Sequence, residues 1–170
     1  SIYELPQLRS GGVASKFANG WQLSGIVIAQ SGFPFSVTSG RDNSFSGIGS
    51  DLADFLGGSA TLPGDRSRGE QVLRWFDTSR FTANAIGTFG NSGRNIIRGP
   101  GFLQADASIL KNTPITERVQ LQFRGEVFNV LNRPNFRLPN STATSAQVGR
   151  ITAVVDDNQR IIQLGLKLLF

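Results

Sequence analysis

The sequence predicts an all-β protein whose strands form an antiparallel up-and-down meander. Its 170 residues include 20 Gly and 7 Pro, a composition that suits a turn-rich β protein better than a bundle of helices. Several segments alternate apolar and polar side chains with a period of two, which is the pattern of a strand with one apolar face. The connections between these segments alternate between short and long. We therefore expect strands that follow one another in the chain to lie side by side in one sheet.

The alternation is clearest in three segments. In the segment 119–131, one parity carries Val119, Leu121, Phe123 and Val127, and the other carries Gln120, Gln122, Arg124 and Glu126. Residues 161–170 repeat this arrangement with a row of leucines, and residues 102–111 do so with leucine, alanine and isoleucine. Each apolar stretch is about ten residues long, the length that a tilted strand needs to cross a bilayer.

Two further strands are expected upstream. The segment 20–39 is long and extended, but Gly32 and Pro34 interrupt it. A bend or bulge is expected at Pro34, because proline has no N–H to donate to a strand ladder. Residues 1–5 look like the end of an earlier strand, and we expect the chain to be a piece of a longer protein.

The connections predict the topology of a transmembrane β-barrel with long extracellular loops. Short turns on one side and long loops on the other are typical of outer-membrane barrels. We expect residues 6–19 and 112–118 to form periplasmic turns, and residues 41–101 and 133–160 to form extracellular loops. Trp21 would then lie near the inner membrane interface, where aromatic side chains form a girdle.

The composition excludes several other classes of protein. Cys and His are both absent, which removes disulfides, zinc sites of the Cys/His type, thiol nucleophiles and the Ser-His-Asp triad. No run approaches the roughly 18 apolar residues of a membrane-spanning helix. The net charge of +5 comes from scattered arginines and not from a basic stripe with interleaved aromatics, so no nucleic acid is expected as a partner. We expect no enzyme activity, no catalytic residues, no metal and no cofactor; a hydrolase built on two carboxylates is a weaker alternative.

The last residues predict an assembly signal. Gln163, Gly165, Leu168 and Phe170 have a spacing that resembles the C-terminal signal of bacterial outer-membrane proteins. The barrel-assembly machinery reads such a segment as an exposed strand edge, which is a template for pairing until its backbone groups are satisfied. This ending predicts a location in the bacterial outer membrane, with Phe170 near the inner interface.

Several segments resemble one family in the same order along essentially the whole chain. They are GWQLSGIVIAQSGFPFSVTSG (20–40), WFDTSRF (75–81), GTFGNSGRNIIRGPGF (87–102), LQFRGEVFNVLNRPNF (121–136) and IQLGLKLLF (162–170). These segments resemble the C-terminal part of the barrel of TonB-dependent outer-membrane receptors, and most closely the large Oar-like kind with a carboxypeptidase-regulatory-like domain. The resemblance implies that residues 1–170 form about five strands of a plugged barrel of about 22.

The resemblance also implies a function and a set of partners. The expected function is uptake of a bulky nutrient across the outer membrane by a TonB-dependent receptor. The expected partners are outer-membrane lipid, lipopolysaccharide, the barrel-assembly machinery, the remainder of the receptor barrel and its plug. TonB would act only through an N-terminal part that this chain lacks. A soluble antiparallel β-sandwich used for binding or adhesion is the alternative, because two packed sheets could bury the same apolar faces.

Three places in the long loops are candidate contacts. Trp75, Phe76 and Phe81 form an aromatic group that could contact an external ligand, or that could be a small hydrophobic cluster which fixes the loop. Asp42, Asp51 and Asp54 could offer oxygens to Ca²⁺, although their spacing does not match an EF-hand and a solvated loop is the better interpretation. Arg94 and Arg98 could contact lipopolysaccharide phosphates.

Overall fold

The computed structural model describes residues 1–7, 12–156 and 159–170, which form two compact units. We call the first the sheet unit and the second the loop unit. The loop unit consists of two insertions in the sheet unit, one after its second strand and one after its fourth. The sheet unit comprises residues 1–29, 103–134 and 156–170, and the loop unit comprises residues 30–102 and 135–155.

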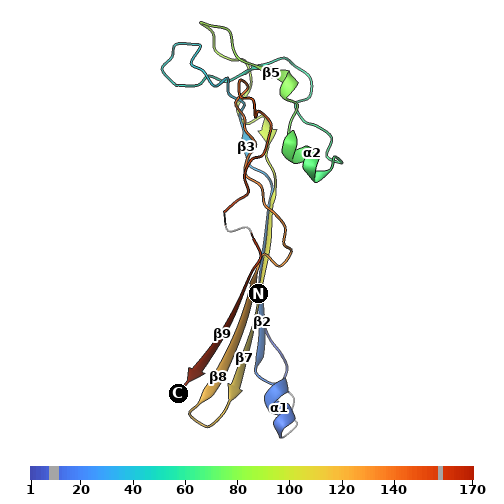
Figure 1. Ribbon diagram of the computed structural model, residues 1–170, viewed down its shortest axis with the longest axis vertical. Coiled ribbons are helices and arrows are strands. Elements are labelled where there is room, and N and C mark those ends of the chain that lie inside the picture. Colours follow the sequence, from blue (N-terminus) through green and yellow to red (C-terminus); the bar gives the residue numbers. More distant parts are fainter. Residues whose placement is uncertain (8–11, 157–158) are drawn as a thin grey trace. The chain divides into compact units, whose positions relative to one another are not determined.

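The sheet unit contains one five-stranded sheet with the order β1-β2-β7-β8-β9 (Figure 1). Pairing is antiparallel between β1 and β2, between β7 and β8, and between β8 and β9. Strands that follow one another along this unit are neighbours in the sheet, so the predicted all-β up-and-down meander is confirmed. The strands are β1 (Ile2–Glu4), β2 (Trp21–Gln30), β7 (Phe102–Pro114), β8 (Gln120–Phe128) and β9 (Ile161–Leu169).

The register places like side chains on the same face across the sheet. Directly opposed residues point to the same side, so the alternation in one strand is matched in the next. One face carries the pairs Leu121↔Leu168, Phe123↔Leu166 and Val127↔Ile162, and the other carries the pairs Gln122↔Lys167 and Glu126↔Gln163. The sheet therefore has an apolar face and a polar face.

Strand β2 fits this pattern over only part of its length. Its Ser24 Oγ lies 2.6 Å from Ser108 Oγ of β7, so the polar face continues across this pair of strands. Ile26 and Ile28 share the parity of Ser24, however, and are 61% and 48% exposed. Val27 lies on the other face, so β2 is apolar on both faces from Ile26 to Ile28.

The prediction of one strand over residues 20–39 is wrong, because β2 ends at Gln30. The backbone passes very close to a neighbouring segment just beyond this point. A Cβ atom at Gly32 would lie 1.8 Å from the carbonyl oxygen of Gly99, so only glycine fits there. The chain then forms the separate two-residue strand β3 (Pro34–Phe35), which pairs with β6 (Ile97–Arg98).

The other strand ends also differ from the sequence prediction by a few residues. β7 continues to Pro114, beyond the expected end at residue 111, because Pro114 is still paired with Gln120, the first residue of β8. β8 ends at Phe128 instead of residue 131. The next residue, Asn129, has a φ of 48° and donates its backbone N–H to Asp106 Oδ1 at 2.9 Å, which turns the chain out of the ladder.

The expected periplasmic turn over residues 6–19 contains a short helix, α1 (Val13–Ala18). A second short helix, α2 (Arg68–Leu73), lies in the loop unit. In the part of the chain that the structure describes, neither helix is long and apolar enough to cross a membrane.

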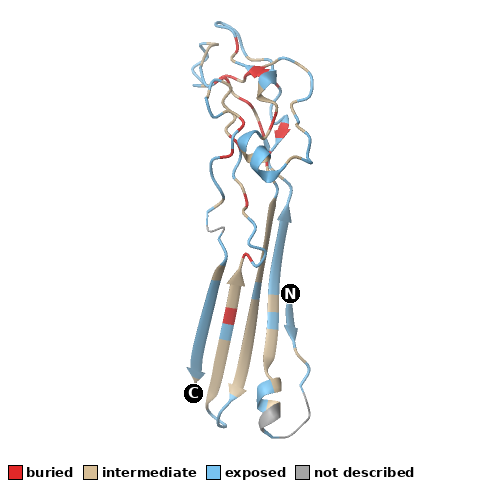
Figure 2. Cartoon of the chain, turned by 45° about the vertical axis from the view of Figure 1, so that its right-hand side comes forward, coloured by how far each residue is buried: buried red, intermediate tan, exposed pale blue. Residues whose placement is uncertain are grey.

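The loop unit has a hydrophobic core of its own. Short pairings organise it: β3 with β6, and β4 (Asp54–Phe55) with β5 (Phe81–Thr82). Figure 2 shows buried residues distributed through this unit, whereas β9 is coloured as exposed along most of its length. The long connections are thus folded together and are not independent loops. The buried core residues are Phe35, Val37, Ala53, Phe76, Phe81 and Ile97.

Candidate functional site

The apolar face of β9 is uncovered by the described residues. Ile162, Leu164, Leu166 and Leu168 are 64%, 74%, 70% and 50% exposed. Four large apolar side chains in a row are an unusually extensive exposed surface for a strand in water. This face requires an apolar environment.

The side chains of the polar face form an ion pair and a hydrogen bond with one another. Arg124 Nη2 lies 2.7 Å from Glu126 Oε1, and Gln122 Nε2 donates to Asn112 Oδ1 at 3.0 Å. Because these residues alternate with the apolar ones along the same strands, a single sheet separates two different environments.

The residues of the predicted assembly signal lie on both faces of β9. Gln163 and Gly165 oppose Glu126 and Arg124 on the polar face, and Leu168 lies on the apolar face. Phe170 follows the strand and is 96% exposed. Among the described residues, β9 pairs with β8 alone, so its other edge is open to a further strand.

A lysine that the sequence analysis did not single out anchors the expected periplasmic turn. The Lys111 ammonium donates to the backbone oxygens of Lys16, Phe17 and Asn19 at 3.0, 3.0 and 2.8 Å. It also lies 4.7 Å from the ring centroid of Trp21, whose indole N–H donates to Phe17 O at 2.8 Å. Lys111 shares the parity of the apolar face, so these contacts satisfy all three protons of a cation there. The signal in the sequence is a single Lys in the apolar phase of a strand.

Replacing Lys111 with methionine is expected to loosen α1. The change keeps the length and apolar stem of the side chain but removes three charge-assisted hydrogen bonds to carbonyls at the end of the helix. We expect amide hydrogen exchange at Asn19 to rise on the order of tenfold, equivalent to about 1.4 kcal/mol. The control is Lys167→Met on the polar face, which should leave this exchange unchanged. Equal exchange in both variants would contradict the proposed anchor.

Two of the three aromatic residues considered as a ligand contact, Phe76 and Phe81, are buried in the loop unit. Phe76 and Phe81 are 1% and 7% exposed, and their ring centroids are 5.7 Å apart in an edge-to-face arrangement. Phe76 also packs edge-to-face on Phe35 at 5.8 Å. Both rings are largely enclosed by protein, so they stabilise the loop unit.

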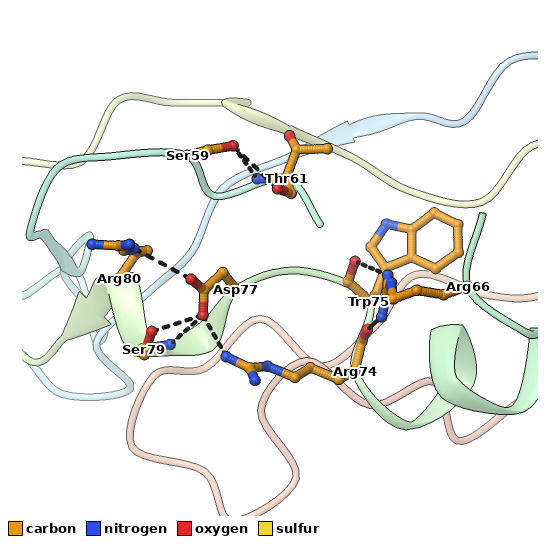
Figure 3. A network of polar contacts seen from close by, with 8 residues as sticks. All are labelled: Ser59, Thr61, Arg66, Arg74, Trp75, Asp77, Ser79 and Arg80. Atoms are coloured by element: carbon orange, nitrogen blue, oxygen red, sulfur yellow. Dashed lines mark hydrogen bonds and ion pairs between the residues drawn. The ribbon is translucent and has the colours of Figure 1, made fainter. Parts of the chain in front are cut away.

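Asp77 holds this aromatic segment in shape (Figure 3). Its carboxylate accepts from Ser79 Oγ at 2.7 Å and from Arg80 Nε at 3.2 Å, and it forms a close ion pair with Arg74. The Ser79 hydroxyl is the main reason that the pKa of Asp77 is lowered. The residue also caps the 3₁₀ turn Thr78–Arg80. Sequence analysis missed this role, although Asp followed two residues later by Ser is a recognisable capping pattern.

Trp75 and Phe76 of the predicted aromatic group line a cavity, and Trp75 is the more exposed of the two. The cavity is about 500 Å³ and is also bordered by Pro63, Gln71, Ile96 and Arg98. The indole N–H donates to Arg98 O at 2.7 Å, which fixes the ring. A half-buried, fixed ring beside apolar walls has the general form of a small-molecule site.

The three carboxylates considered as possible calcium contacts accept hydrogen bonds from the protein. Asp51 is 5% exposed and accepts from Ser44 N at 2.8 Å, Ser44 Oγ at 2.7 Å and Asn84 Nδ2 at 3.0 Å. Asp42 accepts from the backbone N–H groups of Ser46 and Gly47 at 3.0 and 2.8 Å. These carboxylates fix the turns of a loop, and the expectation of a solvated loop is wrong for Asp51, which is buried. Within the described residues no cluster of acidic side chains is suited to a metal.

Acid is expected to loosen the loop held by Asp51. The hydrogen bond from the Ser44 hydroxyl is the main reason that the pKa of Asp51 is lowered from its ordinary value of 3.8. A lowered pKa stabilises the fold above pH 3.8, and this stabilisation is lost as the pH falls through the folded-state value. Amide protection at Ser44, corrected for intrinsic exchange, should therefore be constant from about pH 7 to 5 and should fall below about pH 4. Asp51→Asn should show low protection throughout, and an unchanged acid response in that variant would contradict the assignment.

The two-faced sheet has the strand pattern of an outer-membrane β-barrel protein, apolar toward the membrane and polar toward the inside. Residues 1–163 match the family described as an outer membrane beta barrel domain, and the chain belongs to that family. Its location is the bacterial outer membrane, which excludes the soluble β-sandwich. No curated protein and no solved structure matches the chain.

Proposed function

We propose that the chain forms part of the barrel of a TonB-dependent receptor that takes up a bulky nutrient. The observation that carries this proposal is the loop unit. Its two segments follow the ends of β2 and β8 and lead into the starts of β7 and β9. In an antiparallel sheet with this strand order, these four strand ends lie on the same side. A compact unit with its own core offers a larger recognition surface than separate short loops, as a bulky cargo requires. The ordered resemblance to these receptors supports the same function.

The action of such a receptor is binding and gating, in which no bond is made or broken. The polar face, with the Arg124–Glu126 pair, would face the lumen and the plug. The apolar face would contact acyl chains, and the long loops would lie among lipopolysaccharide. TonB would supply energy through the plug. The two faces of the sheet support the proposed contacts with lipid and with the lumen.

The open edge of β9 fits two successive partners. The barrel-assembly machinery would pair with this edge first, and another strand of the complete barrel would replace it. Gln163, Gly165, Leu168 and Phe170 are the residues that we assign to recognition by the machinery. Alternation of polar and apolar side chains at this edge would set the register of the last pairing.

Uptake can be tested while the cargo is still unidentified. Cells with and without the full-length receptor, each with and without TonB, would be grown in a complex medium, and compounds lost from the medium would be measured by mass spectrometry. The proposal predicts that at least one compound too large for porins disappears only when the receptor and TonB are both present. If every loss that requires the receptor is independent of TonB, the proposed function is wrong.

A further inference from the structure

The loop unit contains a second cavity, separate from the one beside Trp75. It is about 440 Å³, and it is lined by residues from three separate segments of the chain. Its apolar walls include Ile48 and Phe89, which are 75% and 69% exposed, together with Leu52. Arg94 lies at the same cavity. Apolar surface and a guanidinium thus meet in one place.

The Arg94 guanidinium is available to a ligand. Among the described residues it makes no hydrogen bond and no ion pair, unlike Arg66 and Arg80, which bond to carbonyl or carboxylate oxygens. The neighbouring carboxylate, Asp51, is saturated by Ser44 and Asn84. The Asp51 oxygens accept hydrogen bonds from these neutral donors and form no ion pair with Arg94, so the guanidinium can pair with an anionic ligand.

The cavity is built on a rigid base. The N–H of Gly87 donates to Asn43 O at 2.7 Å, and Asn43 Nδ2 donates to Asn84 O at 2.6 Å, so the two loops that carry Ile48 and Phe89 are bonded together. Asn84 is 3% exposed, and its amide also donates to Asp51. Buried polar groups with fixed partners hold a surface in one arrangement before a ligand arrives.

Backbone strain occurs at two of the lining loops. Phe45 has a φ of 57° and Asn95 a φ of 58°. Left-handed backbone is unusual for a bulky residue such as phenylalanine, and such strain is retained mainly where the surrounding structure enforces it at functional sites. Ser36 Oγ accepts from Asn95 N at 2.9 Å and fixes the residue that follows Arg94.

We infer that this cavity binds an amphiphilic anion, a soluble molecule with an apolar body and one carboxylate, sulfonate or phosphate group. The apolar body packs between Ile48 and Phe89, and the anionic group pairs with Arg94. This inference rests on the proposed function in one respect, because the anion is taken to be cargo. It names the chemical class of that cargo.

The test uses the full-length receptor in phosphatidylcholine nanodiscs and two probes, naphthalene-2-sulfonate and the neutral 2-naphthalenemethanol. Binding is measured by calorimetry. The sulfonate should bind saturably at one site, and Arg94→Gln should weaken it at least tenfold while leaving the neutral probe within about twofold. Phe89→Ser should weaken both probes. Two matched controls on α2, Arg68→Gln and Leu73→Ser, should change neither, and amide protection of the loop unit confirms that each variant is folded.

Several results would overturn the inference. They are the absence of saturable sulfonate binding, equal loss in Arg94→Gln and Arg68→Gln, or full binding in Phe89→Ser. A further arm adds lipopolysaccharide to the nanodiscs; if sulfonate binding disappears there, the cavity belongs to lipid phosphates and not to cargo. These nanodiscs contain no TonB, so the result is independent of the uptake experiment. Loss of TonB dependence with intact sulfonate binding would overturn only the proposed function.

Discussion

Replacing Leu164 with arginine is expected to destabilise the protein in a bilayer by about 2–4 kcal/mol, the cost of a guanidinium on the lipid face of a barrel near the midplane. Leu164 is 74% exposed and lies near the middle of β9, opposite Gly125 of β8. The described residues offer an arginine there no carboxylate partner on the same face. Urea unfolding of the full-length protein in phospholipid vesicles would measure the difference in free energy.

The matched control is the neighbouring position, Gln163→Arg. It introduces the same side chain into the same strand, one residue away and on the opposite face. Its partner across the ladder is Glu126, so the new charge meets a carboxylate. We expect a change within about 0.5 kcal/mol. Similar losses at both positions would show that β9 does not separate lipid from a polar interior.

Replacing Phe76 with alanine is expected to lower the stability of the loop unit by about 3–5 kcal/mol, the usual effect of removing a large buried aromatic side chain. Phe76 is 1% exposed and packs on both Phe35 and Phe81. The change leaves a cavity at the centre of the core and removes two edge-to-face contacts. Amide hydrogen exchange in the full-length protein would measure the loss of stability as faster exchange of the loop-unit amides.

The control for this change is Phe33→Ala. Phe33 belongs to the same unit but is 62% exposed, so its removal should cost little. The strands of the sheet unit should keep their protection in both variants, because the loop unit has a separate core. If Phe76→Ala and Phe33→Ala were equally mild, the aromatic cluster would not be the core of this unit.

The strands could be predicted because their pattern is local. A period of two depends only on the residues of one strand, and it identified β7, β8 and β9 within a few residues at each end. The two faces followed from the same alternation. The end of β2 at Gln30 could not be predicted accurately, since it depends on the approach of Gly32 to Gly99, which is far away in the sequence.

The loop unit shows where sequence reasoning is weakest. Phe76 and Phe81 are buried by partners from distant segments, so an aromatic group in a polar loop gave no sign of which rings face solvent. Asp51 similarly depends on Asn84, which is 33 residues away. Lys111 is a different case, because its place in the apolar phase of β7 was visible in the sequence. Its partners, the carbonyls of α1, were not.

The central claim is that one face of the sheet contacts lipid and the other contacts water. Since this chain has no Cys, nitroxide labels can be attached at Leu166→Cys and, one residue away, at Lys167→Cys in the full-length protein with any other Cys replaced. Collision with oxygen, which concentrates in acyl chains, and with a water-soluble nickel complex would be measured by electron paramagnetic resonance. We predict that the label at 166 is relaxed by oxygen and the label at 167 by nickel. A label at 166 that is relaxed mainly by nickel, or by neither reagent, would contradict the account.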